Sequence, residues 1–299
     1  MFKRSHTCGE LDRSFVGSKV KLNGWVNTVR LHGKIVFVDL RDRYGKTQLI
    51  FDENSFPEEF EKIKKMSIED VISIKGTVNN REDSSINPDM KTGGIEIAVS
   101  EYRILNEASP LPFVLSDRSN AEEQFRLKYR YLELRIEELQ KNIIIRHNTY
   151  QATREYLSKN KFLEIETPIL MKSTPEGARD YLVPSRLHHG KFYALPQSPQ
   201  IYKQILMISA YDRYFQIVKC FRDEDLRADR QPEFTQIDIE MSFVDEEDIF
   251  SNMEDLTRSI FSVVQGIELP NPFPRITYQQ AMETYGSDKP DTRYNMKLI

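Results

Sequence analysis

Five short runs of β-forming residues, separated by turn residues, fill the first third of the chain and restrict its fold more than any other feature. The runs are bounded by Gly, Asn and Asp, which is typical of strands joined by turns. The predicted strands are residues 19–26, 35–41, 47–51, 70–78 and 95–105. Between the third and fourth strands, Phe56, Phe60 and Ile63 recur at helical spacing. Five strands with a helix after the third predict an OB-fold, a barrel that commonly binds oligonucleotides.

A pair of closely spaced prolines, Pro110 and Pro112, ends this strand pattern. Because proline disfavours both helix interiors and central strands, we predict a linker or hinge at this point. The predicted organisation is a barrel domain over residues 1–108, a linker over residues 109–140 and a second domain over residues 141–299.

Helix-forming residues follow the prolines. Ser119 or Asn120 can cap a helix that we expect to run to Gln140, and a separate helix is expected to end near Asn160. Beyond it, short β-rich runs alternate with helices, which predicts an α+β domain with an antiparallel sheet. These runs are residues 191–195, 214–220 and 234–243.

Composition and charge exclude several classes of protein. The chain has no continuous apolar stretch of about twenty residues, the length that crosses a bilayer. Residues 1–10 lack the apolar core of a signal peptide, so we expect a cytoplasmic location without membrane association. Cys8 and Cys220 lie outside any Cys-x-x-Cys spacing, and we expect free thiols with neither a disulfide nor a zinc site.

The charge of the chain is unevenly distributed. The net charge is −4, but the first fifty residues carry ten Lys/Arg against four Asp/Glu. A basic N-terminal surface that binds a polyanion is one interpretation of this imbalance. A solvated face without a partner is the other.

Phe37 is predicted to lie on a polar strand face. Alternation along the second strand places Phe37 beside Asp39 and Arg41, on the face opposite the apolar residues. An aromatic ring among charged groups suits base stacking, which is worth about 1–3 kcal/mol per base. A Phe37 ring covered by a neighbouring loop is the alternative that the residues leave open.

A second candidate site begins at Ser198-Pro199-Gln200, which has the composition of a helix start with Ser198 as N-cap and Pro199 at the first helical position. Gln200 and Lys203 then share a face, because residues three apart are neighbours on a helix. The positive end of the helix dipole, together with Lys203, favours a carboxylate ligand. An ordinary capped surface helix is the alternative interpretation.

A charged hairpin is predicted after the strand at 214–220. Residues 221–225 read Phe-Arg-Asp-Glu-Asp, and a polar loop then leads into a return strand. This pattern resembles motif 2 of the class II aminoacyl-tRNA synthetases. Residues 146–168 resemble motif 1, a long dimer-interface helix followed by a strand that ends in proline. Residues 173–181 resemble the mobile loop that closes over aspartate in bacterial aspartyl-tRNA synthetases.

Together these segments make the chain similar to the bacterial aspartate branch of that family. The asparagine and lysine relatives share the hairpin but differ in the mobile loop, and they remain competing substrate assignments. In the family the chain continues beyond Ile299 with an insertion domain and motif 3. The resemblance therefore implies an N-terminal OB-fold, an incomplete catalytic domain that is inactive alone, and a homodimer formed through the motif 1 region.

The reaction that the resemblance implies is that of an aspartate–tRNA ligase using ATP and Mg²⁺. The α-carboxylate of L-aspartate attacks the α-phosphate of ATP, and the aspartyl group passes to the 3′ end of tRNA(Asp), with tRNA(Asn) as a second candidate. Because two anions must meet, fixed cations are needed, and the resemblance makes Arg222 the catalytic residue. The implied ATP-binding residues are Arg222, Asp223, Glu224, Gln231 and Phe234. No metal ligand is expected in this part of the chain.

The aspartate site follows from the same resemblance. The implied aspartate-binding residues are Glu176, Ser198, Gln200, Lys203, Arg222 and Asp238. Lys203 is expected at the side-chain carboxylate, with Gln200 and Asp238 near the α-amino group. Glu176 is expected to arrive when the loop closes. Because Asp238 alternates with other polar residues, an exposed strand face is the alternative for that residue.

The barrel is expected to read the anticodon of the tRNA. The implied anticodon residues are Arg30, His32, Phe37 and Gln48. His32 is expected in the turn Leu31-His32-Gly33, where a histidine resembles the version of the family that charges both tRNA(Asp) and tRNA(Asn). A non-catalytic tRNA-binding fragment or paralogue is the second functional hypothesis, and the intact segments around Arg222 and Glu176 disfavour it.

Overall fold

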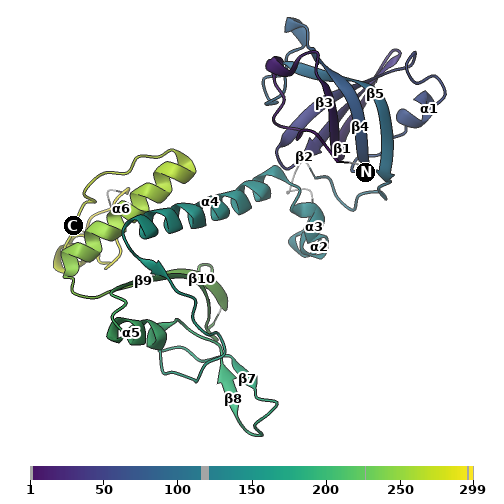
Figure 1. Cartoon of the computed structure of the whole chain (residues 1–299). Coiled ribbons are helices and arrows are strands. Elements are labelled where there is room, and N and C mark those ends of the chain that lie inside the picture. The colour runs from purple at the N-terminus through teal and green to yellow at the C-terminus, as the bar shows by residue number, and fades with distance from the viewer. Residues whose placement is uncertain (1–2, 116–120, 226, 295, 299) are drawn as a thin grey trace. The chain divides into compact units, whose positions relative to one another are not determined.

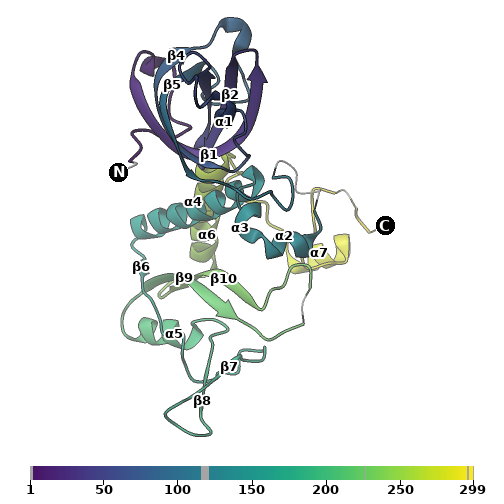
Figure 2. The ribbon, with the colours of Figure 1, turned by 90° about the vertical axis from the view of Figure 1, so that its right-hand side faces the viewer.

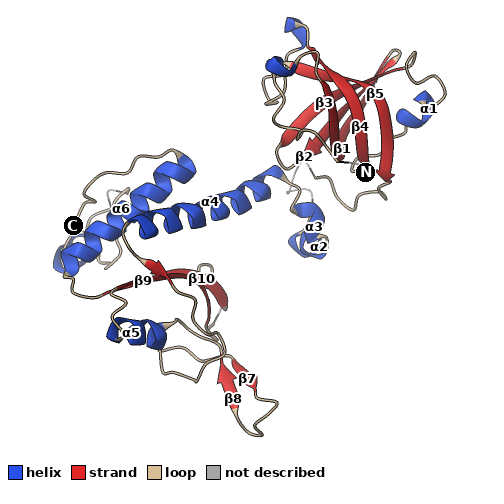
Figure 3. Cartoon of the chain, in the orientation of Figure 1, coloured by secondary structure: helices blue, strands red, loops and turns tan. Residues whose placement is uncertain are grey.

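The computed structural model describes residues 3–115, 121–225, 227–294 and 296–298. The chain divides into two compact units, Met1–Lys141 and Asn142–Ile299. Figures 1 and 3 show a strand-rich first unit that ends in helices and a second unit in which helices and strands are mixed. Within those described ranges, no helix is both long enough and apolar enough to cross a membrane.

The first unit is built around a closed barrel with strand order β1-β2-β3-β5-β4, whose curvature is clear in Figure 2. The strands are β1 (Lys19–His32), β2 (Ile35–Asp42), β3 (Gly45–Asp52), β4 (Val71–Asn80) and β5 (Ile95–Asn106). Neighbouring strands are antiparallel, except that β3 and β5 pair in parallel and close the barrel. Helix α1 (Phe60–Ile63) lies between β3 and β4. This order confirms the predicted OB-fold.

Apolar side chains from alternate strand positions fill the barrel. Val36 and Val38 of β2 are fully buried, as the alternation predicts. Phe60 and Ile63 of α1 are buried in the same apolar cluster, together with Phe56 just before the helix. Because burial of apolar surface is the main favourable term in folding, this shared cluster holds α1 on the barrel.

Helices α2, α3 and α4 follow the barrel and differ from the prediction. Their bounds are Glu123–Lys128, Arg130–Glu133 and Glu137–Lys159. The predicted helix end at Gln140 is wrong, because α4 runs without a break across that point. Two breaks lie earlier: one at Tyr129, whose backbone leaves the helical region (φ −106°, ψ 40°), and one between Glu133 and Glu137. The expected caps Ser119 and Asn120 lie outside the described residues.

The second unit contains a sheet with strand order β10-β9-β6 and a separate β7-β8 pair. The strands are β6 (Leu163–Glu164), β7 (Leu182–Pro184), β8 (Phe192–Ala194), β9 (Arg213–Phe221) and β10 (Glu233–Met241). The helices after α4 are α5 (Gln200–Ile208), α6 (Glu246–Gln265) and α7 (Tyr278–Tyr285). β9 and β10 form the predicted antiparallel hairpin, whereas β6 is parallel to β9. The α+β prediction is confirmed.

A small apolar cluster holds the β9–β10 hairpin in place. Leu157 of α4 and Leu256 of α6 pack with Phe162 and Phe215, and the four side chains are buried. Helix and sheet therefore share one core in this unit, and the hairpin carries its charged loop at the end away from Phe215, between Phe221 and Glu233.

Candidate functional site

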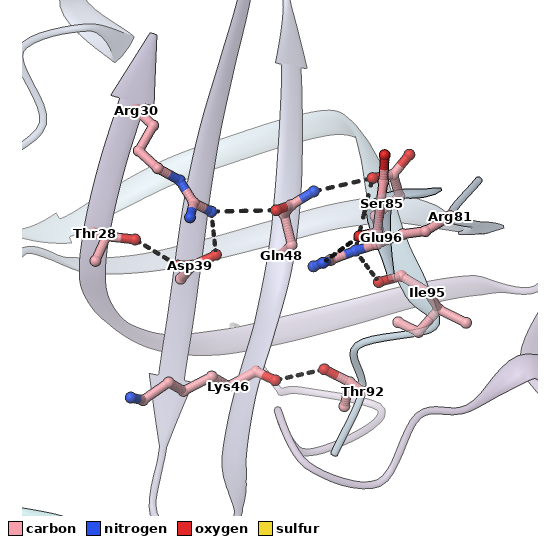
Figure 4. Close-up of polar contacts among 10 residues, drawn as sticks. All are labelled: Thr28, Arg30, Asp39, Lys46, Gln48, Arg81, Ser85, Thr92, Ile95 and Glu96. Atoms are coloured by element: carbon pink, nitrogen blue, oxygen red, sulfur yellow. Dashed lines mark hydrogen bonds and ion pairs between the residues drawn. The ribbon is translucent and has the colours of Figure 1, made fainter. Parts of the chain in front are cut away.

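The outer face of β1, β2 and β3 carries polar side chains in register. Thr28 lies opposite Asp39, which lies opposite Gln48 on the next strand. Two residues along, Arg30 lies opposite Phe37. Figure 4 shows Thr28, Arg30, Asp39 and Gln48 converging across three neighbouring strands. The register thus brings three of the four predicted anticodon residues together.

Arg30 links these side chains. Its Nη2 donates to Asp39 Oδ1 (2.9 Å) and to Gln48 Oε1 (3.2 Å). Thr28 Oγ1 donates to the other oxygen of Asp39 (2.5 Å). The Arg30 side chain is 54% exposed, whereas Asp39 is buried. Because the guanidinium is held at one edge and exposed elsewhere, it can still donate to a base edge or a phosphate.

Arg81 and Glu96 extend this polar surface and were missed by the sequence reasoning. Gln48 Nε2 donates to Glu96 Oε2 (3.0 Å), and Arg81 Nε lies 3.9 Å from the same oxygen. Burial raises the pKa of Glu96 and lowers that of Arg81, and the charge of each opposes the shift of the other. Arg81 Nη2 is buried without a hydrogen-bond partner among the described residues. Alternation with the buried Ile95 and Ile97 is the signal that could have placed Glu96 here.

Phe37 and His32 lie on the same surface with different exposure. Phe37 is half-buried, and His32 is exposed as the last residue of β1. The prediction of a turn at His32 is wrong, because His32 still pairs with Ile35 of β2. The turn consists of Gly33 and Lys34, and Gly33 has the positive φ (58°) that glycine adopts without a steric cost.

In the second unit, Lys203 of α5 lies between two carboxylates of β10. Lys203 Nζ is 2.9 Å from Asp238 Oδ1 and 3.3 Å from Glu240 Oε2. Only 12% of the Lys203 side chain is exposed. Burial alone lowers the pKa of Lys203, but the hydrogen bond and charge of Asp238, with those of Glu240, outweigh it and raise the pKa. The cation therefore stays charged in a largely enclosed position.

One carboxylate oxygen of Asp238 has no hydrogen-bond partner among the described residues. The residue is 8% exposed, so the interpretation as an exposed strand face is wrong. Burial raises the pKa of Asp238, and Lys203 opposes that shift. Oδ2 is buried and has no hydrogen-bond partner within the described part of the chain. Tyr214, whose hydroxyl influences this carboxylate, donates to Gln216 (3.0 Å) instead.

Ser198 does not cap helix α5, contrary to the prediction. The cap position is Pro199, and helix α5 begins at Gln200. Ser198 Oγ instead donates to Glu176 Oε2 (2.6 Å), and Thr174 Oγ1 donates to Glu176 Oε1 (2.9 Å). Because helix α5 begins one residue later than predicted, Ser198 lies outside the cap position, and its hydroxyl instead joins two segments of the predicted site.

The loop of residues 173–181 is fastened by Gln197. Its Nε2 donates to the Ala178 carbonyl (2.8 Å) and to Asp180 Oδ1 (2.6 Å), and its Oε1 accepts from the Ala178 N–H (3.0 Å). On the other side, Asp223 N–H donates to the Arg179 carbonyl (3.0 Å). These bonds place the loop against the β9–β10 hairpin.

A pocket of about 350 Å³ opens at the end of that hairpin. It is lined by Arg222, Glu224, Asp225, Asp229, Arg230, Gln231 and Phe234. The Arg222 guanidinium carbon lies 5.0 Å from the centre of the Phe234 ring, and Arg230 Nη1 is 2.8 Å from Glu224 Oε2. Four of the predicted ATP-binding residues thus share one cavity. The fifth, Asp223, does not line it and faces Arg179 at 3.8 Å.

The side chains around Lys203 and those around Arg222 both act on Cys220 of β9. Burial raises the pKa of its thiol to about 11, and Asp238 adds to the shift while Arg222 opposes it. Glu176 and Lys203 also act on this thiol. Residues that the sequence places up to 62 positions apart, Glu176 and Asp238, therefore share one electrostatic environment. A thiol with this pKa stays protonated at neutral pH and is a poor nucleophile.

The described residues contain no group of three or more His, Cys, Asp or Glu side chains that could hold a metal ion. Oxygen ligands are what Mg²⁺ prefers, and it commonly binds through one or two carboxylates and substrate phosphates.

Family models match both units. Residues 122–299 match the model described as tRNA synthetases class II (D, K and N), and residues 20–105 match an OB-fold nucleic acid binding domain. Among solved structures, asparaginyl-tRNA synthetase from Pyrococcus horikoshii complexed with asparaginyl-adenylate is 27% identical with a TM-score of 0.79, covering 89% of this chain and 59% of that one. The Entamoeba histolytica asparaginyl-tRNA synthetase in complex with asparaginyl-adenylate is 25% identical with a TM-score of 0.76, covering 89% and 62%.

Curated relatives are more similar in sequence. The aspartate–tRNA(Asp/Asn) ligase of Persephonella marina is 57% identical over 99% of this chain and 49% of its own length. The aspartate–tRNA ligase of Staphylococcus saprophyticus is 53% identical over 100% of this chain and 51% of its own length. The chain thus spans about half the length of the curated relatives it matches.

Proposed function

Because the chain belongs to the family of class II tRNA synthetases (D, K and N), we propose that the protein is an aspartate–tRNA ligase. It activates L-aspartate with ATP and transfers the aspartyl group to tRNA(Asp). The names of the curated relatives support the amino acid and the tRNA. The charged groups around Lys203 support the same amino acid.

The observation that carries the proposal is the enclosed pair of Lys203 and Asp238. Aspartate brings two carboxylates and one ammonium, and each needs a partner of opposite charge when it leaves water. Lys203 matches the side-chain carboxylate. The unpartnered Asp238 Oδ2 matches the α-ammonium group. Neutral asparagine forgoes the ion pair with Lys203, so the pair favours aspartate.

Neighbouring residues complete the amino acid pocket in this proposal. Gln200 precedes Lys203 by three residues on α5 and adds a neutral donor and acceptor near the α-amino group. Glu176 is held by Ser198 and Thr174 and supplies a second carboxylate for the ammonium. Glu176 lies on the loop of residues 173–181, which in this proposal closes over the bound amino acid.

ATP is proposed to bind in the pocket at the end of the β9–β10 hairpin. Phe234 offers an aromatic face for the adenine ring, and Gln231 and Glu224 supply donors and acceptors for the rest of the nucleotide. Arg222, stacked on Phe234, is placed to contact a phosphate group. Asp223 faces the loop and is proposed to position Arg179 rather than touch ATP.

In the proposed mechanism, catalysis consists of orientation and electrostatic stabilisation. An oxygen of the aspartate α-carboxylate bonds to the α-phosphorus while the bond to pyrophosphate breaks, which gives aspartyl-adenylate. The Arg222 guanidinium offsets the repulsion between the two anions as they approach. A terminal adenosine hydroxyl of the tRNA then attacks the acyl carbon, and AMP leaves. The protonated thiol of Cys220 takes no covalent part.

The proposed reaction uses Mg²⁺ together with ATP. When bound, Mg²⁺ neutralises phosphate charge. We propose that Mg²⁺ binds together with the phosphates of the ATP substrate.

The barrel surface is proposed to bind the anticodon. Phe37 supplies a stacking face, and Arg30 and Gln48 supply donors and acceptors for base edges. The excess of Lys and Arg among the first fifty residues supports contacts with the phosphate backbone. His32, exposed at the end of β1, supports tRNA(Asn) as a second substrate, as do relatives named for both tRNAs.

The proposal includes a homodimer in the cytoplasm, where tRNA and ATP are available. Helix α4 extends into the motif 1 region, and just before that region it exposes three consecutive isoleucines, Ile143, Ile144 and Ile145. Neighbouring exposed apolar side chains favour a protein interface. A second copy of the chain is the partner that we propose for them.

Amino-acid-dependent exchange of pyrophosphate into ATP tests the function in the full-length protein. We expect exchange with aspartate and background levels with asparagine or lysine. Exchange that requires asparagine or lysine would assign the protein to another branch of the family. Tight tRNA binding with no exchange for any amino acid would support the non-catalytic alternative.

A further inference from the structure

Glu69 occupies an unusual position just before β4. Its backbone is left-handed (φ 73°), and the residue is only 4% exposed. A residue with a side chain is uncommon in this conformation, which costs free energy and persists where surrounding contacts require it. Contacts of the Glu69 side chain therefore hold its backbone in this conformation.

Both carboxylate oxygens of Glu69 are engaged by arginines. Arg41 Nη2 donates to Oε1, and Arg135 Nη1 donates to Oε2. The two arginines also meet directly, because Arg41 Nη1 donates to the Arg135 carbonyl (3.4 Å). The Arg135 guanidinium carbon lies 5.3 Å from the centre of the Trp25 ring. Burial lowers the pKa of Arg41, and the Glu69 charge opposes that shift.

The two arginines come from functionally different segments. Arg41 lies on β2, two residues after Asp39, so alternation places both on the strand face that also carries Phe37. Arg135 lies two residues before α4, the helix that continues into the second unit. Glu69 thus joins the proposed anticodon surface to the start of that helix.

The neighbouring Asp70 holds the other end of the linker. Asp70 Oδ1 accepts from the Ala108 N–H (2.7 Å), where the chain leaves the barrel. Val26 of β1 brackets this acidic pair, because its N–H donates to the Asp70 carbonyl (2.9 Å) and its carbonyl accepts from the Glu69 N–H (2.8 Å). Two adjacent carboxylates therefore fix the linker at Ala108 and again at Arg135.

We propose that Glu69 is a positioning residue that couples anticodon reading by the barrel to aminoacylation. The inference rests on the proposed function. A shift of β2 when tRNA binds moves Arg41, and the Glu69 bridge passes the displacement to Arg135 and α4. Coupling of this kind can travel through contiguous contacts between the two segments, and the Arg41–Glu69–Arg135 bridge supplies such contacts.

Stability alone does not account for such a cluster. Buried ion pairs are often replaceable by apolar residues without loss of stability, so their presence points to specificity or positioning. A charged bridge differs because it fixes direction and distance, through hydrogen bonds to both carboxylate oxygens.

The test compares Glu69→Gln with Glu101→Gln in the full-length protein. Gln keeps the Cβ and the shape of Glu69, so backbone strain is unchanged while both ion pairs are lost. Glu101→Gln makes the same chemical change in the exposed Lys75–Glu101 pair of the barrel. Aminoacylation is measured with a tRNA(Asp) transcript and with a transcript whose anticodon is substituted, and the ratio of the two kcat/KM values reports the coupling.

We expect Glu69→Gln to lower that ratio about tenfold, mainly through kcat on the cognate transcript. Aspartate-dependent pyrophosphate exchange without tRNA, and the Kd of an isolated anticodon stem-loop, should match those of the parent and of Glu101→Gln. An unchanged ratio would overturn the proposal, and so would a stem-loop affinity that falls in proportion, since Glu69 would then support the barrel surface only.

Arg135→Met provides a second variant that removes the bridge from the linker side and leaves the barrel backbone intact. It should reproduce the lower ratio, and Arg135→Lys should restore part of it. If Arg135→Met leaves the ratio at the parent value, the coupling role is overturned even where Glu69→Gln fails to fold. Absence of aspartate-dependent exchange in the unsubstituted protein is a separate result and would overturn the proposed function.

Discussion

Lys203 Nζ lies 2.9 Å from Asp238 Oδ1, so a cation of helix α5 and an anion of strand β10 neutralise each other in a largely enclosed position. An aspartate ligand can add a carboxylate to Lys203 and an ammonium to Asp238 Oδ2, turning one ion pair into an alternating array of charges. Both protein charges are already removed from most of the solvent, so binding carries little further desolvation cost for them. The pair is in this sense preorganised for a zwitterion.

Lys203→Met should abolish most aspartate activation. The substitution leaves Asp238 and the incoming carboxylate without a cation, and an unpaired buried charge costs about 3–5 kcal/mol. Pyrophosphate exchange at varied aspartate should show a loss of kcat/KM of at least about a hundredfold, or 2.7 kcal/mol. The KM for ATP should stay within about twofold, because Lys203 does not line the ATP pocket.

Lys219→Met is the matched control for this experiment. Lys219 lies on β9 in an exposed pair with Glu233, so its loss should change aspartate kinetics little. Equal effects of the two substitutions, or normal aspartate kinetics in Lys203→Met, would remove Lys203 from the amino acid site.

Titration of Cys220 should make the second unit less stable at high pH. Burial raises the pKa of the thiol from 9.0 to about 11, so the folded state holds the proton to higher pH than the unfolded state does. The resulting stability is fully present below pH 9 and is lost as the pH rises to about 11, by at most about 2–3 kcal/mol. Urea unfolding followed by circular dichroism measures this loss.

Cys220→Ser isolates that contribution, because serine can keep a donor toward Gln236, which now accepts from the thiol (3.2 Å). The variant should show a shallower fall of unfolding free energy between pH 9 and 11 than the parent does. Parallel curves for the two proteins would mean that the thiol does not titrate in this range.

Phe37→Ala should weaken binding of tRNA by the barrel. Loss of one base stack costs about 1–3 kcal/mol, so the Kd of an anticodon stem-loop should rise about fivefold or more. Tyr44→Ala is the control, since Tyr44 is an exposed aromatic that lies in the β2–β3 turn. Fluorescence anisotropy at two salt concentrations should show weaker binding at high salt for all three proteins. A Kd that responds equally to both substitutions would argue against a stacking role for Phe37.

The barrel could be predicted from the sequence because the alternation of apolar and polar residues within each strand decides which side chains are buried. Alternation in β2 buries Val36 and Val38 and turns Phe37 outward, and no distant residue changes that outcome. The start of α5 shows the opposite case. Ser198 has the composition of a cap, but helix α5 begins one residue later than the local pattern predicts, and the Ser198 hydroxyl donates to Glu176 of a distant loop.

Asp238 and Glu69 show why other site features escape the sequence. Asp238 sits in a polar alternation that favours solvent, yet it is buried where Lys203 of α5 contacts it. Glu69 belongs to a bridge whose two arginines are 94 residues apart. Such contacts are set by tertiary packing, so the pattern of neighbouring residues carries no signal for them.

The last prediction concerns the choice between tRNA(Asp) and tRNA(Asn), which differ at the third anticodon base. His32 is exposed at the end of β1, on the same strand as Arg30 and two residues beyond it, so its imidazole can meet a base next to the one that Arg30 contacts. A histidine can donate or accept a hydrogen bond, and one such contact discriminates weakly between bases. The full-length protein should therefore charge both tRNAs with kcat/KM values within about tenfold, or 1.4 kcal/mol. His32→Ala should widen the gap if the imidazole supports the tRNA(Asn) base and leave the tRNA(Asp) value nearly unchanged. A preference for tRNA(Asp) of about a hundredfold or more in the unsubstituted protein would rule out dual specificity and leave the anticodon-binding role of the barrel standing.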